Sequence, residues 1–232
     1  MKLDLTEQFY FDGFARVKVS HNSEYHEWRS LVTELDALDL DGEVFFEKSY
    51  KQTFDLIKAD DRYTNTILNF VKNSNLLKTV SDLTCGTYVL GDFTLRKTYS
   101  KQSYMDWHRD TYFNFDGKLI GRVPPLIKII LYPTVNSKSV PCLKVIPGSH
   151  RRVFQNRFLD RCQSFFVSND VFYSNDDEAI VFDSSIMHSA SRSVLNNGAF
   201  RLIFNFCHSS QIGEFRNGAI VQELLGRSSK SR

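Results

Sequence analysis

Short apolar or alternating runs, separated by clusters of Gly, Pro, Asn, Asp and Ser, make up the chain from about residue 86 onward. The runs are Tyr88–Leu90, Phe93–Tyr99, Tyr104–Phe113, Leu126–Tyr132, Leu143–Ile146, Gln163–Val167, Ala179–Phe182 and Phe200–Cys207. Segments of about four to eight residues at this spacing predict the strands of a β-sandwich or barrel, and they argue against alternating strand–helix units. The 232 residues include 20 Phe, so the chain can supply a large aromatic core.

Helical patterns precede this region. A short helix is expected to end near Asp12-Gly13, and a strand is expected to begin at Phe14. An amphipathic helix starts near Ser23, because the large apolar residues after it recur at helical spacing. A second helical region covers roughly residues 54–83. Both helical regions are interpreted as scaffold.

The expected organisation is a single domain over residues 1–232. About 1–85 form a helical N-terminal support, about 86–210 form the β core, and about 211–232 form a C-terminal segment and tail. The Ser-, Lys- and Arg-rich end of the chain is expected to be a mobile tail.

Composition limits the classes of partner. The net charge is only +2, from 29 basic and 27 acidic residues, which gives no reason to expect nucleic acid or a membrane as a partner. Four scattered cysteines fit a reducing compartment better than a disulfide framework or a zinc knuckle. No signal peptide is evident, and no apolar run approaches about 18 residues. We therefore expect a soluble, cytoplasmic protein, and the sequence leaves its oligomeric state open.

The stretch Trp107-His108-Arg109-Asp110 places an imidazole and a carboxylate two residues apart. On a strand, residues i and i+2 point to the same face, so His108 and Asp110 can converge on one point. Joined by a distant second histidine, such a pair forms the facial triad of non-haem Fe(II) oxygenases. Because the chain has six histidines, the pair alone is a weak signal.

Two later segments each deliver a histidine. Ala179–His188 has the pattern of a buried strand followed by a turn, and His188 stands at its end. Asp183 belongs to that turn and is not expected to be a ligand. Pro141–His150 has the pattern of a strand running into a Pro-Gly turn, and His150 is interpreted as a turn residue of the fold. Both histidines lie far from His108 in the sequence, as the second histidine of such a triad does.

Arg201 lies in the middle of an alternating strand, on the face opposite four large apolar residues. In a sandwich covered by helices, this face would point into the interior, where an unpaired guanidinium is costly. The arginine therefore needs an anion. A bound carboxylate, gripped through two hydrogen bonds, and a structural ion pair with Asp183 or Asp110 are equally compatible with the residue types.

At this point the sequence resembles a known family. The ordered set WHRD, CLKVIPGSHR, FDSSIMHS and FRLIFNF, with the opening FYFDGFARVKV, is similar to the phytanoyl-CoA dioxygenase-like family of iron(II)/2-oxoglutarate oxygenases. The similarity runs from about residue 7 to 208. It implies a mainly β protein whose double-stranded β-helix (jelly-roll, cupin-like) core carries N-terminal α-helices packed on its outside.

The resemblance also implies a cofactor and its ligands. His108, Asp110 and His188 would ligate Fe(II) and leave sites for the co-substrate 2-oxoglutarate and for O2. Arg201 would bind the distal carboxylate of 2-oxoglutarate. Lys97 occupies a strand where the family often places a lysine near the co-substrate, although a surface lysine is the plainer interpretation. Relatives that halogenate have a small residue in place of the acid, so Asp110 favours hydroxylation.

Three neighbours of these residues have less certain roles. Arg109 stands where relatives often have Gln, but on a strand its side chain should point away from the metal face. Trp107 is expected to pack beside His108 and orient it. Ser189 and Ser191 either bind the co-substrate carboxylate or, as turns favour, satisfy backbone groups.

Aromatic and cationic residues near the expected site are candidates for contacts with a substrate. They are Tyr112, Phe113 and Phe115, with Arg122, Lys128, Arg151 and Arg152. Core packing is the simpler role for the aromatic residues, and ordinary solvated charge is the simpler role for the cations.

The predicted function is that of an Fe(II)/2-oxoglutarate-dependent dioxygenase. Such an enzyme would hydroxylate an unactivated C–H bond of a small-molecule or carrier-bound substrate, with release of succinate and CO2. One alternative is a catalytically silent jelly-roll module that binds a metal or ligand. Another is a metal-dependent isomerase or hydrolase of the wider cupin type, which would leave Arg201 without a role. The sequence does not identify the substrate.

Overall fold

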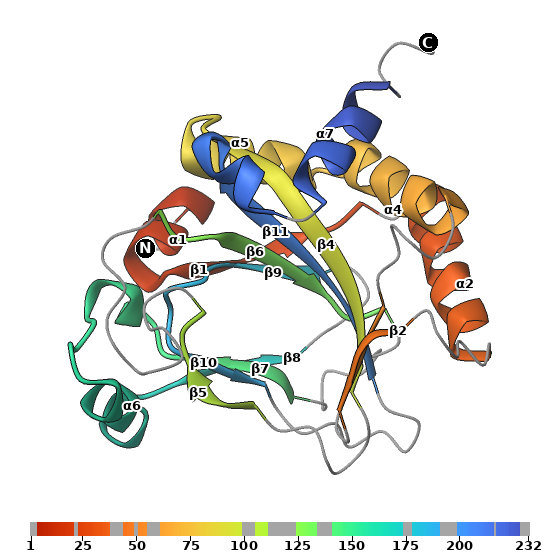
Figure 1. Ribbon diagram of the computed structural model, residues 1–232. Helices are drawn as coiled ribbons and strands as arrows, with labels where there is room; N and C mark the ends of the chain where they lie inside the picture. Colours follow the sequence, from red (N-terminus) through yellow and green to blue (C-terminus); the bar gives the residue numbers. More distant parts are fainter. Residues whose placement is uncertain are drawn as a thin grey trace.

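Two antiparallel β-sheets of unequal size lie at the centre of the molecule, as Figure 1 shows. They are seen in a computed structural model that describes residues 4–20, 23–37, 44–48, 51–54, 61–98, 105–110, 124–133, 141–173, 178–190, 199–215 and 217–227.

The larger sheet has seven strands and the smaller sheet has four. The larger sheet contains β1 (Phe14–Lys18), β2 (Val44–Lys48), β3 (Lys51–Phe54), β4 (Tyr88–Thr98), β6 (Ile127–Leu131), β9 (Glu178–Asp183) and β11 (Ala199–His208), in the spatial order β1-β9-β6-β11-β4-β3-β2. The smaller sheet contains β5 (Met105–His108), β7 (Pro141–Val145), β8 (Asp170–Tyr173) and β10 (His188–Ala190), in the order β5-β10-β7-β8. From β4 onward the chain passes back and forth between the sheets, so strands distant in sequence become neighbours.

Helices cover the outer face of the larger sheet. The α-helices are α1 (Leu5–Asp12), α2 (Ser23–Ala37), α4 (Asp61–Asn73), α5 (Leu76–Thr84), α6 (Arg157–Phe166) and α7 (Gly218–Arg227), and the 3-10 helices are η1 (Ser149–Arg151) and η2 (Ser209–Glu214). In Figure 1, α2, α4, α5 and α7 lie above the larger sheet, whereas α6 lies beside the smaller one. Among the helices that the structure describes, none is both long and apolar enough to cross a bilayer.

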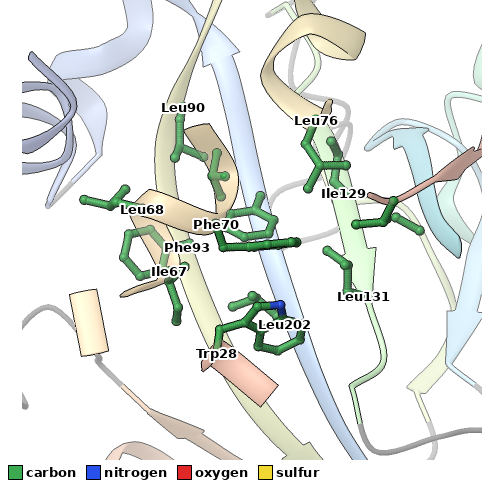
Figure 2. Packing of buried hydrophobic residues seen from close by; sticks show 14 of the residues in the cluster. Trp28, Ile67, Leu68, Phe70, Leu76, Leu90, Phe93, Ile129, Leu131 and Leu202 are labelled. Carbon is green, nitrogen blue, oxygen red and sulfur yellow. The ribbon is translucent and has the colours of Figure 1, made fainter. Parts of the chain in front are cut away.

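The main core lies between these helices and the larger sheet. Trp28 of α2 and Phe70 of α4 are fully buried, with ring centroids 5.4 Å apart. Figure 2 shows them against Phe93 of β4 and Leu202 of β11. Because alternate residues of a strand point to opposite faces, β11 sends its large apolar residues into this core and Arg201 toward the smaller sheet. The expected alternation of this strand is confirmed.

The predicted end of the first helix is also confirmed. Asp4 and Glu7 cap the start of α1 through reciprocal hydrogen bonds of 2.8 and 3.1 Å. Gly13 ends the helix with φ +82°, and a Cβ there would lie 2.4 Å from a ring atom of His150. His150 therefore packs against the helix end, and its Nε2 lies 3.2 Å from the Tyr10 carbonyl oxygen. This is a structural role, as expected.

Several elements differ from the expectation of a mainly β protein with helices confined to its N-terminal part. Gln163–Val167, expected as a strand, falls at the end of α6, and α7 adds a second late helix. Within the expected helical region 54–83, the described residues form the helices α4 and α5, and the expectation had no hairpin β2–β3 and no strand β8. The error at α6 has a physical cause: Asn156 caps this helix, which then buries its polar side instead of its apolar side.

Candidate metal and co-substrate site

The pairing of β5 with β10 brings together the two histidines of the predicted triad. His108 and His188 are direct register partners, and their ring centroids are 4.3 Å apart. Asp110 follows β5, and its backbone N–H donates a 3.0 Å hydrogen bond to the Ser184 carbonyl oxygen in the turn before β10. The antiparallel ladder thus places three residues from two distant segments at one edge of the smaller sheet.

Both imidazole rings are oriented by backbone carbonyls. Nδ1 of His108 lies 2.7 Å from the carbonyl oxygen of Asp106, and Nδ1 of His188 lies 2.9 Å from that of Ile186. A carbonyl oxygen only accepts hydrogen bonds, so each Nδ1 carries the proton and each Nε2 keeps its lone pair. The two Nε2 atoms lie 3.6 and 3.4 Å from oxygens of Asp110.

These three side chains fit a metal ion. Their ligand atoms all lie within 4.8 Å of one another. Two ligands bound about 2.1 Å from one metal, at angles of about 90° to 110°, are separated by about 3.0 to 3.4 Å, close to the separations observed here. Two neutral imidazoles and one carboxylate on one side of an ion are the donor set of non-haem Fe(II) sites.

Electrostatics keeps all three groups in their metal-binding forms. Burial lowers the pKa of His188 to about 4, and burial also lowers the pKa of His108, so both rings are neutral near neutral pH. Burial alone would raise the pKa of Asp110, but Lys128 and the two histidines lower it below its usual range. The Nζ of Lys128 lies 2.8 Å from Oδ2 of Asp110. Lys128 therefore belongs to the site and is not an ordinary solvated lysine.

Arg201 lines the same pocket as the triad. Its side chain projects from β11 and is 5% exposed. It lies beside the hydroxyl of Tyr132, whose pKa is raised by burial, and Arg201 acts against that rise. Within the described part of the chain, Nε of Arg201 has no hydrogen-bond partner, and no ion pair joins Arg201 to Asp110 or Asp183. The structure thus leaves Nε of Arg201 available to an anionic ligand.

A second arginine enters this pocket from the neighbouring strand. Arg96 of β4 is the register partner of Arg201 and also lines the pocket. Lys97, the residue singled out from the sequence, pairs with Phe200 on the helix-covered face, where its Nζ lies 5.4 Å from the Phe200 ring centroid. The sequence could have identified Arg96 from the alternation of β4, because Phe93 and Leu95 mark the face that meets the core and Arg96 lies on the opposite face.

Arg109 points away from the metal face, as expected, but its role was missed. It is 7% exposed, and its guanidinium binds the carboxylate of Asp160 through two hydrogen bonds. It also donates to the carbonyl oxygens of Ser149, Ser185 and Arg152. Arg109 therefore holds the segment that carries His108 and Asp110 against α6 and against the turn before β10.

The remaining candidates are distributed as follows. Asp183 accepts hydrogen bonds from the backbone N–H and the hydroxyl of Ser185, which places it in the turn. Ser189 is buried on β10. The backbone carbonyl of Trp107 accepts a hydrogen bond from the side chain of Arg161. Arg151 and Arg152 are exposed beside α1 and do not line this pocket. Tyr112, Phe113, Phe115, Arg122 and Ser191 lie outside the described residues.

Comparisons with known proteins give a fold but no sequence family. No protein-family model matches the chain, and no curated protein matches it by sequence. Solved structures do match. EvdMO1 is 16% identical over 88% of this chain with a TM-score of 0.67, and the chain spans 49% of that protein.

Two further structures match over most of both chains. HygX from Streptomyces hygroscopicus, solved with nickel, 2-oxoglutarate and hygromycin B, is 16% identical, with 90% of this chain and 88% of HygX covered and a TM-score of 0.67. SnoN from nogalamycin biosynthesis, an epimerase solved with Fe3+, alpha-ketoglutarate and nogalamycin RO, is 12% identical, with 88% and 82% covered and a TM-score of 0.68. At these identities the likeness establishes the fold.

Proposed function

We propose that this protein is an Fe(II)/2-oxoglutarate-dependent oxygenase that hydroxylates a C–H bond of a small-molecule or carrier-bound substrate. One observation carries the proposal. Two histidines and one aspartate converge in a pocket that also contains a buried arginine whose Nε has no hydrogen-bond partner among the described residues. The triad alone would fit many metal sites, whereas the arginine adds a specific anion-binding group beside it.

Each residue has a stated role in this proposal. His108, Asp110 and His188 would hold Fe(II). The iron would supply the activation of O2 when 2-oxoglutarate is bound, and the 2-oxoglutarate would be converted to succinate and CO2. Arg201 would bind the distal carboxylate of the co-substrate, and Arg96 would add a second positive charge on the same side of the pocket. Apolar side chains, including Leu143 of β7, line the rest of the pocket and limit water around the reacting groups.

The arrangement of strands supports the same proposal. From β4 to β11 the chain alternates between the two sheets in the manner of a double-stranded β-helix. We assign the chain to the phytanoyl-CoA dioxygenase-like group within this architecture, because the motifs that carry the resemblance fall on β5, β7, β10 and β11. We also take residues 1–232 as one oxygenase domain.

Hydroxylation is the favoured reaction, although proteins of the same fold include an epimerase and a carbocyclase. Asp110 supplies a carboxylate where a halogenating site needs room for a halide. HygX was solved with hygromycin B bound, which supports a small molecule as the substrate of this pocket.

The proposal is tested by titrating the metal-free protein anaerobically with Fe(II) and 2-oxoglutarate. A weak visible charge-transfer band should appear and should be absent in His108→Ala. The Arg201→Ala variant should still bind Fe(II) but should require more 2-oxoglutarate for the same band. No band in the wild type, or an equal band in His108→Ala, would refute the metal assignment.

Turnover separates the enzyme from a silent binding module. Succinate should form when Fe(II), 2-oxoglutarate, ascorbate and a panel of small molecules are supplied under air. A protein that gives the charge-transfer band but forms no succinate with any compound would instead be a ligand-binding module. Product analysis by mass spectrometry, with a gain of one oxygen atom, distinguishes hydroxylation from epimerisation or ring closure.

A further inference from the structure

Helix α6 exposes its apolar side. Phe158, Leu159, Phe165 and Phe166 are 73%, 54%, 81% and 86% exposed. They recur at positions i, i+1, i+7 and i+8, so they form one stripe along the helix. A surface helix of a globular protein normally turns such a stripe toward the core. The orientation of α6 is the reverse.

The reversed orientation is held by buried polar contacts. Asp160 and Gln163, on the opposite side of α6, are 1% and 7% exposed. Asp160 receives two hydrogen bonds from Arg109 and one from Gln163, and Gln163 also donates to the Arg152 carbonyl oxygen. Turning the helix to bury its phenylalanines would break this buried ion pair, which is strongly destabilising. The exposure of the stripe is therefore built into the fold.

The apolar surface extends beyond the helix. Phe154, just before α6, is 48% exposed, and Tyr10 and Phe11 at the end of α1 are 66% and 45% exposed. Seven of the nine large apolar side chains that are exposed in the described part of the chain belong to these two elements and the loop before α6. Figure 1 shows α1 and α6 on the same side of the molecule. We call this surface the α1–α6 face.

Arginines accompany the apolar side chains. Arg151 and Arg152 are exposed, and Arg151 bridges to α1 by donating a hydrogen bond to the Phe11 carbonyl oxygen. Arg157 is exposed at the start of α6, whereas the side chain of Arg161 is 41% exposed and lies 3.9 Å from a carboxylate oxygen of Asp106. The only acid in the segment 151–166 is Asp160, which is buried against Arg109. The part of this face formed by α6 and the segment before it is therefore apolar at its centre and positive around it, whereas α1 contributes the acids Asp4, Glu7 and Asp12.

We propose that the α1–α6 face binds an anionic lipid surface, a partner that the net charge of the whole chain gave no reason to expect. Phenylalanines that protrude from a convex helix suit the interface of a bilayer, which adapts to their shape, and arginines beside them suit phosphate headgroups. Self-association through the same face is disfavoured, because it would bring the arginines of two copies together. The proposal is independent of the chemistry at the metal site, although α6 contacts β5 and would hold the metal-binding strand near the lipid.

Vesicle flotation tests the proposal with the full-length protein. The protein should float with phosphatidylcholine vesicles that contain phosphatidylglycerol and should not float with pure phosphatidylcholine. Phe165→Ser/Phe166→Ser should weaken binding at least about tenfold, because two inserted phenylalanines are lost. Arg157→Gln should weaken it about fivefold and should reduce its dependence on salt. Ile220→Ser is the matched control, because Ile220 is an apolar side chain that is 45% exposed but lies on α7, outside the α1–α6 face.

Other outcomes would overturn the proposal. A lower melting temperature in Phe165→Ser/Phe166→Ser would show that another part of the chain covers the stripe. Dimerisation in light scattering that this variant abolishes would make the face an interface between two copies. Retention on immobilised polyglutamate without any vesicle binding would indicate an acidic protein partner. Equal flotation with neutral and anionic vesicles would exclude a role for the arginines.

Discussion

Arg109 and Asp160 form a buried bidentate ion pair, with Nε to Oδ2 at 2.6 Å and Nη2 to Oδ1 at 3.0 Å. Arg109 stands between His108 and Asp110 in the sequence, and Asp160 is the buried acid of α6. One contact therefore fixes both the segment that carries these two candidate ligands and the helix whose phenylalanines are exposed. The site and the α1–α6 face depend on the same pair.

Removing one partner of this pair should be strongly destabilising. Arg109→Met leaves Asp160 buried without its counter-charge, so the free energy of unfolding should fall by about 3 to 5 kcal/mol. Metal affinity should fall with it, because His108 and Asp110 flank the lost anchor. Urea unfolding and calorimetric titration with Fe(II) or Co(II) measure the two effects.

A double variant provides the control. Arg109→Met/Asp160→Leu removes both charges, so it should be more stable than Arg109→Met alone. If the two substitutions instead add their losses, the pair is not the anchor described here.

Metal-free protein should lose stability as the pH falls from about 6.5 toward about 4. Burial lowers the pKa of His188 to about 4, whereas the unfolded chain keeps the ordinary value of 6.5. Between these values the unfolded state binds a proton that the folded state excludes, so the free energy of unfolding rises with pH. The lowered pKa of His108 acts in the same direction. The contribution of His188 is at most roughly 3 kcal/mol.

Urea unfolding of the metal-free protein at a series of pH values measures this slope. The slope should be smaller in His188→Gln, which has no titrating ring at that position. A wild-type profile that is flat across the window, or one that His188→Gln leaves unchanged, would contradict the assignment.

The two neighbouring cations of β4 should behave differently toward the co-substrate. Arg96 faces the pocket beside Arg201, whereas Lys97 lies on the helix-covered face against Phe200. Arg96→Met should therefore raise the Kd for 2-oxoglutarate by about 10- to 100-fold, the effect of losing one charge-assisted hydrogen bond. Lys97→Met should change this Kd less than threefold, because Lys97 does not face the pocket and has no hydrogen bond to 2-oxoglutarate to lose.

The Fe(II)/2-oxoglutarate charge-transfer band reports both affinities. Lys97→Met is the matched control, because it removes a cation of similar size one residue away. A larger effect from Lys97→Met than from Arg96→Met would support the prediction of Lys97 made from the sequence and would contradict the role given to Arg96.

The aromatic contact beneath the helices should carry much of the stability. Trp28 is fully buried against Phe70, so Trp28→Ala should lower the free energy of unfolding by about 3 to 5 kcal/mol. Phe158→Ala should change it by less than about 0.5 kcal/mol, because Phe158 is 73% exposed. Chemical denaturation of both variants gives the comparison, and equal losses would contradict the packing in Figure 2.

Some features followed from the sequence because they depend only on local pattern. Alternation along β11 was enough to separate Arg201 from the apolar residues that face the helices. The Asp12-Gly13 pair was enough to end the first helix, since glycine accepts the positive φ that this turn requires. The His-x-Asp spacing on a strand was enough to point both ligands one way, and the ordered motifs supplied His188 as their partner.

Other features needed the tertiary structure. A local pattern gives the spacing of the residues on one face of a strand or helix, but it does not say which face packs against the rest of the protein. Whether Arg96 or Lys97 enters the pocket depends on which face of β4 meets the helices. Whether α6 buries its apolar or its polar side depends on Arg109, which lies far from it in the sequence. The sequence alone therefore identified the His108, Asp110 and His188 side chains that converge, whereas only the packing of distant segments decided what surrounds them and which phenylalanines remain on the surface.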